Sequence, residues 1–155
     1  MSTKSLEERI RELESAHQIA NLKAKYGHAC DAGYDAVAIA DLFTEDGVWD
    51  GGAHGEFVGR DAIRTFFEGA SDVYSFAVHW FTNPMIEVDG DEGRGTWYLF
   101  MAATTSEEQM PVWNAARYDD EFVRRDGVWY FRRLQLRHWF TTPFDRGWVD
   151  RPSIR

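Results

Sequence analysis

The sequence predicts a single α+β domain, spanning residues 1–155, in which helices come first and an antiparallel sheet follows. Two observations lead to this prediction. Apolar residues recur at steps of three and four from Ser5 to Ala32, as they do on one face of a helix. Runs rich in β-branched and aromatic residues fill most of residues 73–142, and short turn sequences separate them. A chain of 155 residues suits one compact domain with one core.

The helices are predicted from capping signals and apolar spacing. Within an N-terminal region of residues 1–33, one long helix or two joined helices cover residues 5–32, and Ser5 and Glu8 form a capping box. A face of small residues on this helix ends at Asp31. Asp35 can cap a short helix over residues 36–43. Residues 61–70 are amphipathic and predict a further helix.

The strands form two groups. Residues 48–50 follow a turn at residues 45–47 and begin a short strand. After a loop, residues 56–58 form a short returning strand. The longer strands are predicted at residues 73–88, 95–105, 110–124 and 128–142, with Pro84 at a bulge or an edge. Asp126 and Gly127 are typical of a two-residue hairpin turn. A tail covers residues 143–155. Curling this sheet around a helix would leave a conical cavity open at one end.

Composition narrows the classes of partner. The net charge is −9 and no basic stripe is visible, so nucleic acid is not an expected partner. One cysteine, Cys30, allows neither an internal disulfide nor a thiolate metal site, and no ligand-spacing motif for a metal is present. No stretch approaches the roughly 20 apolar residues needed to cross a bilayer. We therefore expect a cytoplasmic protein that binds neither metal nor membrane.

Aromatic residues make up 15% of the chain. Large aromatic side chains often line apolar ligand cavities, so we expect a pocket for a hydrophobic small molecule. A bulky β-rich core is the alternative explanation of the same composition.

Asp31 and His79 are the main candidates for catalysis. Asp31 ends a helix face of small residues, and His79 lies in a run that otherwise resembles a buried strand. A carboxylate that orients an imidazole makes it a usable general base near neutral pH. The alternative is a helix-end carboxylate and a buried histidine with a structural hydrogen bond.

Four local motifs carry a resemblance to a known family. They are Leu42–Trp49, Gly59–Ile63, His79–Pro84 and Arg124–Trp129. With the order of elements, they resemble the SnoaL-like branch of the nuclear-transport-factor-two-like superfamily, whose fold is a cystatin-like cone. Asp31 and His79 are similar to the dyad of its dehydrochlorinases. Together with Tyr26 they resemble the catalytic set of its bile-acid and scytalone dehydratases.

The resemblance implies elimination without a cofactor. His79 would remove a proton from carbon, Asp31 would hold the imidazole, and Tyr26 would assist the leaving group. Resemblance and strand parity together suggest that the substrate lies against Trp49, Trp97, Leu99, Met101 and Val112. Asn114 could bind a substrate oxygen or pair with backbone at a bulge, and His138 could face the cavity or its rim. Two departures concern the substrate. Met101 stands where the bile-acid enzymes carry a carboxylate, and their arginine has no clear match, with Leu134 or His138 near its place.

Two other functions stay open at this point. One is a ketosteroid-isomerase-like proton shuttle in the same cone, which would need a deep carboxylate base. The other is a non-catalytic ligand-binding or assembly module, because a fold does not fix a function. In every case we expect a homo-oligomer, a trimer or a dimer. An apolar outer sheet face around Trp129, Phe131 and Trp139 would need covering.

Overall fold

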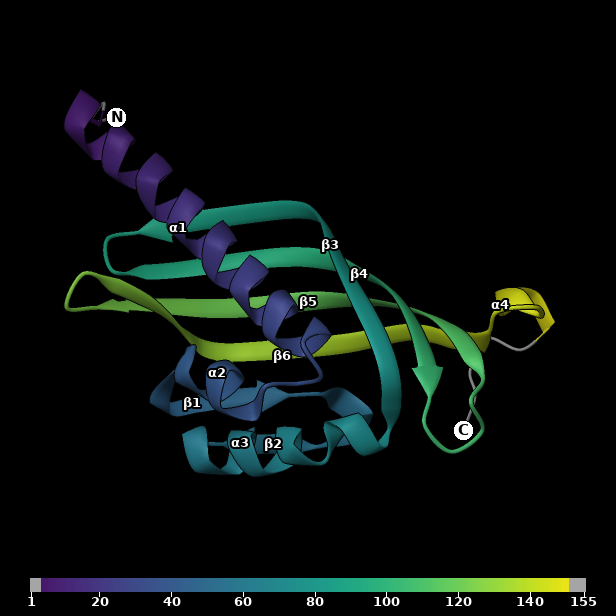
Figure 1. Cartoon of the computed structure of the whole chain (residues 1–155). Coiled ribbons are helices and arrows are strands. Elements are labelled where there is room, and N and C mark those ends of the chain that lie inside the picture. Colours follow the sequence, from purple (N-terminus) through teal and green to yellow (C-terminus); the bar gives the residue numbers. More distant parts are fainter. Residues whose placement is uncertain (1–3, 151–155) are drawn as a thin grey trace.

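The computed structural model describes residues 4–150, and residues 151–155 of the predicted tail lie outside the described residues. The helices are α1 (Leu6–Asp31), α2 (Ala36–Asp41), α3 (Arg60–Glu68) and the short α4 (Gly147–Asp150), with single 3-10 turns η1 (Gly52–His54) and η2 (Ala70–Asp72) (Figure 1). The strands are β1 (Phe43–Asp50), β2 (Glu56–Val58), β3 (Tyr74–Asp89), β4 (Glu92–Thr105), β5 (Pro111–Arg125) and β6 (Val128–Pro143). Among residues 4–150, no helix is both long and apolar enough to cross a membrane.

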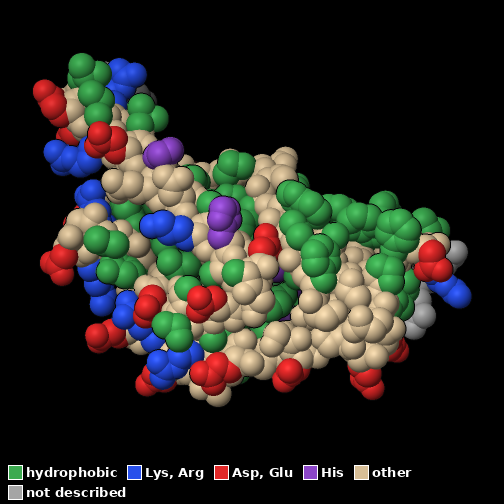
Figure 2. Space-filling view, in the orientation of Figure 1, with side chains coloured by type: hydrophobic (Ala, Val, Ile, Leu, Met, Phe, Trp, Pro, Cys, Tyr) green, Lys and Arg blue, Asp and Glu red, His purple; other side chains and the backbone are tan. Residues whose placement is uncertain are grey.

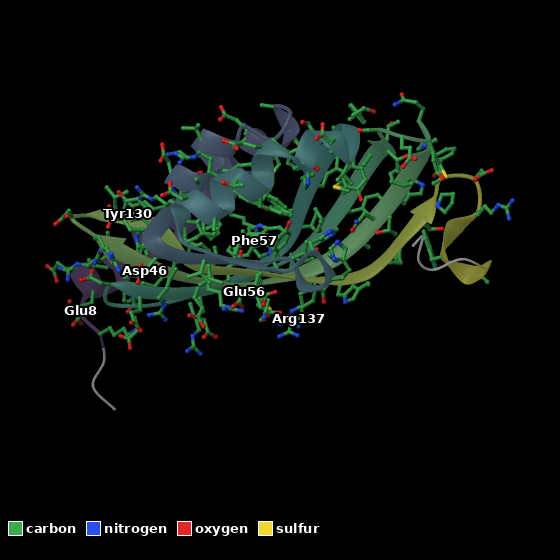
Figure 3. All side chains as sticks on the ribbon, turned by 90° about the horizontal axis from the view of Figure 1, so that it is seen from below. Glu8, Asp46, Glu56, Phe57, Tyr130 and Arg137 are labelled. Atoms are coloured by element: carbon green, nitrogen blue, oxygen red, sulfur yellow. The ribbon has the colours of Figure 1, made fainter. Side chains whose placement is uncertain are left out.

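One six-stranded sheet holds the fold together. Its strand order is β2-β1-β6-β5-β4-β3, and every neighbouring pair is antiparallel except β1 with β6, which is parallel. The sheet curves, and α1 crosses its concave side while its first turns project beyond the strands (Figure 1). Seen from below, α2, α3 and the end of α1 lie on one side of the sheet and Arg137 projects from the other (Figure 3). The predicted α+β architecture, a curved sheet around N-terminal helices, is confirmed.

Helix α1 forms as one continuous helix of 26 residues, with the predicted capping box between Ser5 and Glu8. Its C-terminal half packs on the sheet through residues that include Ile19, Leu22 and Tyr26. This packing places the last turn of α1, and with it Asp31, against β3.

Strand β1 begins five residues earlier than predicted, at Phe43. The expected turn at residues 45–47 lies inside this strand, where the pairing with β6 shifts register between Phe43 and Val48. Gly47 belongs to this irregularity, because a Cβ there would lie only 2.9 Å from Cβ of Phe43. The turn-like sequence therefore encodes a bulge in a strand.

The prediction for the outer sheet face is wrong for two of its three residues. Trp129 and Phe131 are buried on the concave side, whereas Trp139 is 52% exposed. The cause is a register shift, in which Phe131 pairs with Phe122 but Arg133 pairs with Glu121. One extra residue in β6 reverses which side chains face the helices.

Candidate functional site

A cavity of about 330 Å³ lies between the sheet, the end of α1 and the α3–η2 segment. Its size is typical of small-molecule sites. Most of the lining is apolar or aromatic, and the lining contains three histidines and no Lys, Arg, Asp or Glu. Within residues 4–150, no three His, Cys, Asp or Glu side chains are grouped so that they could hold a metal ion.

Asp31 and His79 are in direct contact at the edge of this cavity. The Asp31 Oδ1 atom lies 2.7 Å from His79 Nδ1 and also accepts a hydrogen bond from the backbone N–H of His79 at 3.0 Å. The Asp31 side chain keeps 30% of its surface exposed, whereas the His79 side chain is 6% exposed and lines the cavity. The carboxylate therefore lies behind the imidazole, which separates it from the cavity.

A close approach of α1 to β3 makes this contact geometrically feasible. Gly27 faces the ring of Phe81, and a Cβ at position 27 would lie 2.7 Å from Cε2 of that ring. The small-residue face noted in the sequence thus includes one position at which only glycine fits. One helical turn further on, Asp31 comes within reach of His79, whose backbone pairs with Met101 of β4.

Electrostatics favour a neutral His79. Burial is the main influence and lowers its pKa below the usual 6.5, and Lys23 acts in the same direction, while the hydrogen bond to Asp31 and the charge of Asp31 oppose both. Because Oδ1 of Asp31 lies 2.7 Å from Nδ1 and accepts a hydrogen bond, the Nδ1 atom carries the proton and donates it. The Nε2 atom then keeps a lone pair, which is the arrangement required of a general base.

Tyr26 lies in the same wall but is engaged with another side chain. Its hydroxyl oxygen accepts a hydrogen bond from Nε1 of Trp49 at 3.0 Å, and only 2% of the residue is exposed. Burial raises its pKa well above 10, so the hydroxyl stays protonated. Tyr26 can therefore donate a hydrogen bond into the cavity, but it is a weak proton donor.

The structure places most, though not all, of the predicted lining residues around the cavity. Trp49, Leu99, Met101, Asn114 and His138 line it. The other two, Trp97 and Val112, are buried in the core outside the lining.

Trp97 and Val112 share the correct sheet face but lie too far along it. The ring of Trp97 packs against Phe122 at a centroid distance of 5.9 Å, away from His79. Val112 pairs with Pro143 near the end of β6. Side-chain parity predicts the face of a strand but not the extent of a cavity along it.

Asn114 contributes a polar group with an unused acceptor. Its Nδ2 atom donates to Oγ1 of Thr141 at 3.0 Å, but its buried Oδ1 atom has no hydrogen-bond partner. The strand pairing places His79, Met101, Asn114 and Thr141 in one row across β3 to β6. Two strand spacings, roughly 10 Å, therefore separate the backbones of His79 and Asn114. An unpaired buried acceptor is costly unless a ligand donates to it.

Several cavity residues were missed from the sequence. Phe66 and Phe67 line the cavity from α3, and Tyr118 lines it from β5. His54 lies on η1 and also faces the cavity. The amphipathic pattern of α3 signals burial, but no periodicity marks a histidine on a loop.

Comparisons with known proteins match this architecture. The family model of the SnoaL-like domain matches residues 11–135. Among curated proteins, no sequence matches the chain. Among solved structures, a scytalone dehydratase candidate from Novosphingobium aromaticivorans is 24% identical, with a TM-score of 0.78 over 85% of this chain and 89% of that one.

Two further solved structures show the same fold. An aromatic ring hydroxylase candidate from Novosphingobium aromaticivorans is 27% identical, with a TM-score of 0.77 over 84% of this chain and 94% of that one. The hexachlorocyclohexane dehydrochlorinase LinA-type3 from Novosphingobium barchaimii is 24% identical, with a TM-score of 0.79 over 87% of this chain and 93% of that one. The predicted resemblance is confirmed: the chain belongs to the SnoaL-like domain family, with a cystatin-like α+β fold.

Proposed function

We propose that this protein is a lyase that eliminates water or halide from a hydrophobic, cyclic small molecule without a cofactor. The contact between Asp31 and His79, with the imidazole at the wall of an apolar cavity, is the observation that carries the proposal. Dehydratase and dehydrochlorinase neighbours of the same fold support the reaction class.

The reaction would proceed at Nε2 of His79. This atom takes a proton from carbon, the electrons of the C–H bond form a carbon–carbon double bond, and the leaving group departs with the electrons of its own bond. Asp31 stabilises the imidazolium that forms, because a carboxylate hydrogen-bonded to Nδ1 favours the charged ring. Tyr26 donates a hydrogen bond to the departing atom. The unpaired Oδ1 atom of Asn114 can accept a hydrogen bond from a substrate hydroxyl.

Elimination assays on two kinds of cyclic substrate test the proposal. Chlorinated cyclohexanes report halide release, and cyclic β-hydroxyketones report water loss through the near-ultraviolet absorbance of the new conjugated double bond. We expect Asp31→Asn to lower kcat by about 10⁴-fold, as loss of the orienting carboxylate does in the Ser-His-Asp triad. His79→Ala should abolish turnover, and full activity in this variant would disprove the mechanism.

The same assays separate the two other functions. Deuterium incorporation next to the carbonyl, without loss of the leaving group, would indicate a proton shuttle of the isomerase type. Ligand binding without turnover, retained in the Asp31→Asn/His79→Ala double variant, would indicate a binding module. His17→Gln is a suitable control, since His17 lies on the exposed side of α1.

A further inference from the structure

A second pair of polar side chains lies at the open end of the cavity. The rings of His54 and His138 are edge to face, with their centroids 5.2 Å apart, and both line the cavity. Both residues are solvent-exposed overall, unlike the His79 side chain. Among the described residues, neither ring has a hydrogen-bond partner. His54 comes from η1 and His138 from β6, so two separate segments bring the pair together.

The loop that carries His54 requires glycine at three positions. A Cβ at Gly51 would lie 2.3 Å from the ring of Trp49. Gly52 and Gly55 have φ angles of +61° and +102°, in the region that favours glycine. A backbone hydrogen bond of 2.9 Å from Gly51 to Gly55 closes the loop. These constraints hold His54 in one position over the cavity.

Asp50 fastens this loop to the strand that carries His138. Its Oδ1 atom accepts a hydrogen bond from the backbone N–H of Gly52 at 3.0 Å. Its Oδ2 atom accepts hydrogen bonds from Arg133 and Gln135 of β6, each at 2.7 Å. Because β6 also carries His138, the relative position of the two histidines is fixed by a network outside the cavity.

The two imidazoles add hydrogen-bond donors to a cavity whose catalytic end presents two acceptors. At that end, the acceptors are the lone pair on Nε2 of His79 and the Oδ1 atom of Asn114, which has no hydrogen-bond partner. A neutral imidazole carries one N–H donor. Burial lowers the pKa of His54 below the usual 6.5, and burial together with the nearby His54 lowers the pKa of His138 to about 4, so the neutral form of both rings is favoured at pH 7. The pair thus offers N–H donors to a ligand oxygen at the open end.

We propose that His54 and His138 bind a hydrogen-bond-accepting oxygen of the substrate, such as a ring carbonyl, at the opposite end of the cavity from His79. This inference rests on the proposed function and narrows its substrate class. It predicts an oxygenated ring compound, because a pure halocarbon has no group that would use these donors. His54 and His138 are specificity residues in this scheme, and the proton is still removed by His79.

Calorimetric titration with two inert ligands tests the inference. Indan-1-one carries a ring carbonyl that only accepts hydrogen bonds, and indane has the same rings without the oxygen. We expect the wild-type protein to bind the ketone more tightly than the hydrocarbon. His54→Phe and His138→Phe should each weaken ketone binding about five-fold, the usual effect of one lost hydrogen bond, and leave indane binding nearly unchanged.

Two further variants keep the result interpretable. His138→Gln retains an N–H donor and should keep part of the preference for the ketone, and thermal unfolding shows whether each variant is folded. His17→Phe, outside the cavity, should bind both ligands as the wild type does. Equal binding of ketone and hydrocarbon by the wild type would overturn the inference. So would a preference that survives in the folded His54→Phe/His138→Phe double variant, since the donor would then be another group.

The ligand test is independent of turnover. Indan-1-one has no leaving group, so its binding does not depend on whether His79 catalyses elimination. A clear ketone preference in a protein without elimination activity would support the binding role of His54 and His138 and contradict the lyase proposal. Elimination activity without a ketone preference would support the lyase proposal and contradict the binding role of His54 and His138.

Discussion

The ammonium group of Lys23 lies 2.7 Å from the carboxylate of Asp120, and both side chains are shielded from solvent. The Nζ atom of Lys23 lies 3.3 Å from the ring centroid of Tyr118, a residue that lines the cavity on its other side. Asp120 also accepts a hydrogen bond from the backbone N–H of Gln135 at 3.3 Å. Burial lowers the pKa of Lys23 to about 8 and raises that of Asp120 to about 6, so burial opposes ionisation of both groups.

Removing one partner of this ion pair should cost more than removing both. Lys23→Met or Asp120→Asn alone should lower the free energy of unfolding by about 3–5 kcal/mol, because each leaves a buried charge without its partner. The double variant should lose clearly less than the sum of the two, since no buried charge remains. Urea unfolding followed by tryptophan fluorescence measures all four proteins. Additive losses would show that the two charges are energetically independent.

The elimination activity should have an acid limb with a midpoint below pH 6.5. In the proposed mechanism neutral His79 is the base, and burial lowers its pKa, so protonation and loss of kcat/KM are expected only as the pH falls through that lowered value. Unfolded chains bind this proton at higher pH, so the contribution of His79 to stability also declines as the pH drops below about 6.5. A midpoint above 6.5 would contradict the assignment of His79 as the base.

Local sequence signals predict the large elements well. The capping box and the steps of three and four locate α1, and the turn at Asp126 and Gly127 locates the β5–β6 hairpin. These features depend on neighbouring residues alone, so one sequence is enough to find them. The motif around His79 and the end of α1 likewise lead to the two residues that the structure joins.

Features that depend on register are harder to predict. One extra residue in β6 places Trp129 and Phe131 inside the fold, and a bulge extends β1 across an apparent turn. The approach of His54 to His138 depends on the pairing of β1 with β6, which are far apart in the chain. No local sequence pattern indicates a pairing between strands that are far apart in the chain. A register shift of one residue, which is equally invisible locally, exchanges the two faces of a strand.

Self-association remains a prediction, and the outer face of the sheet is where we expect it. Exposed aromatic side chains gather there, among them Trp80, Phe100 and Trp139, and Phe100 stacks on Trp113 at 5.0 Å. Figure 2 shows hydrophobic side chains concentrated at the end of the molecule that carries α4. Apolar patches of this kind commonly mark protein interfaces.

Sedimentation velocity tests this expectation. The wild-type protein should sediment as a dimer or trimer, and Phe100→Glu should shift it toward the monomer, because a charge on the covered face is costly to bury. Val58→Glu introduces the same charge at an exposed position on β2, outside the aromatic cluster, and should leave the assembly unchanged. A wild-type monomer, or an identical effect of both substitutions, would contradict the prediction.

Gly27 should control the contact between Asp31 and His79 although it touches neither the substrate nor the dyad. The ring of Phe81, 2.7 Å from a Cβ at position 27, cannot move freely, because it packs on Tyr118 at 5.4 Å and on His79 at 6.2 Å. In Gly27→Ala, either α1 moves away from β3 or the ring is pushed among its neighbours. Both movements lengthen the hydrogen bond that holds the imidazole.

We expect Gly27→Ala to lower kcat/KM about ten-fold, which corresponds to about 1.4 kcal/mol and lies within the usual cost of overpacking. Because the hydrogen bond from His79 to Asp31 raises the pKa of His79, its weakening should also move the imidazole titration, followed by NMR, to lower pH. Phe81→Leu removes the ring edge that a new methyl group would meet, so the Gly27→Ala/Phe81→Leu double variant should recover part of both losses relative to Gly27→Ala. An unchanged His79 titration in Gly27→Ala would show that the spacing of α1 and β3 does not set the geometry of the dyad.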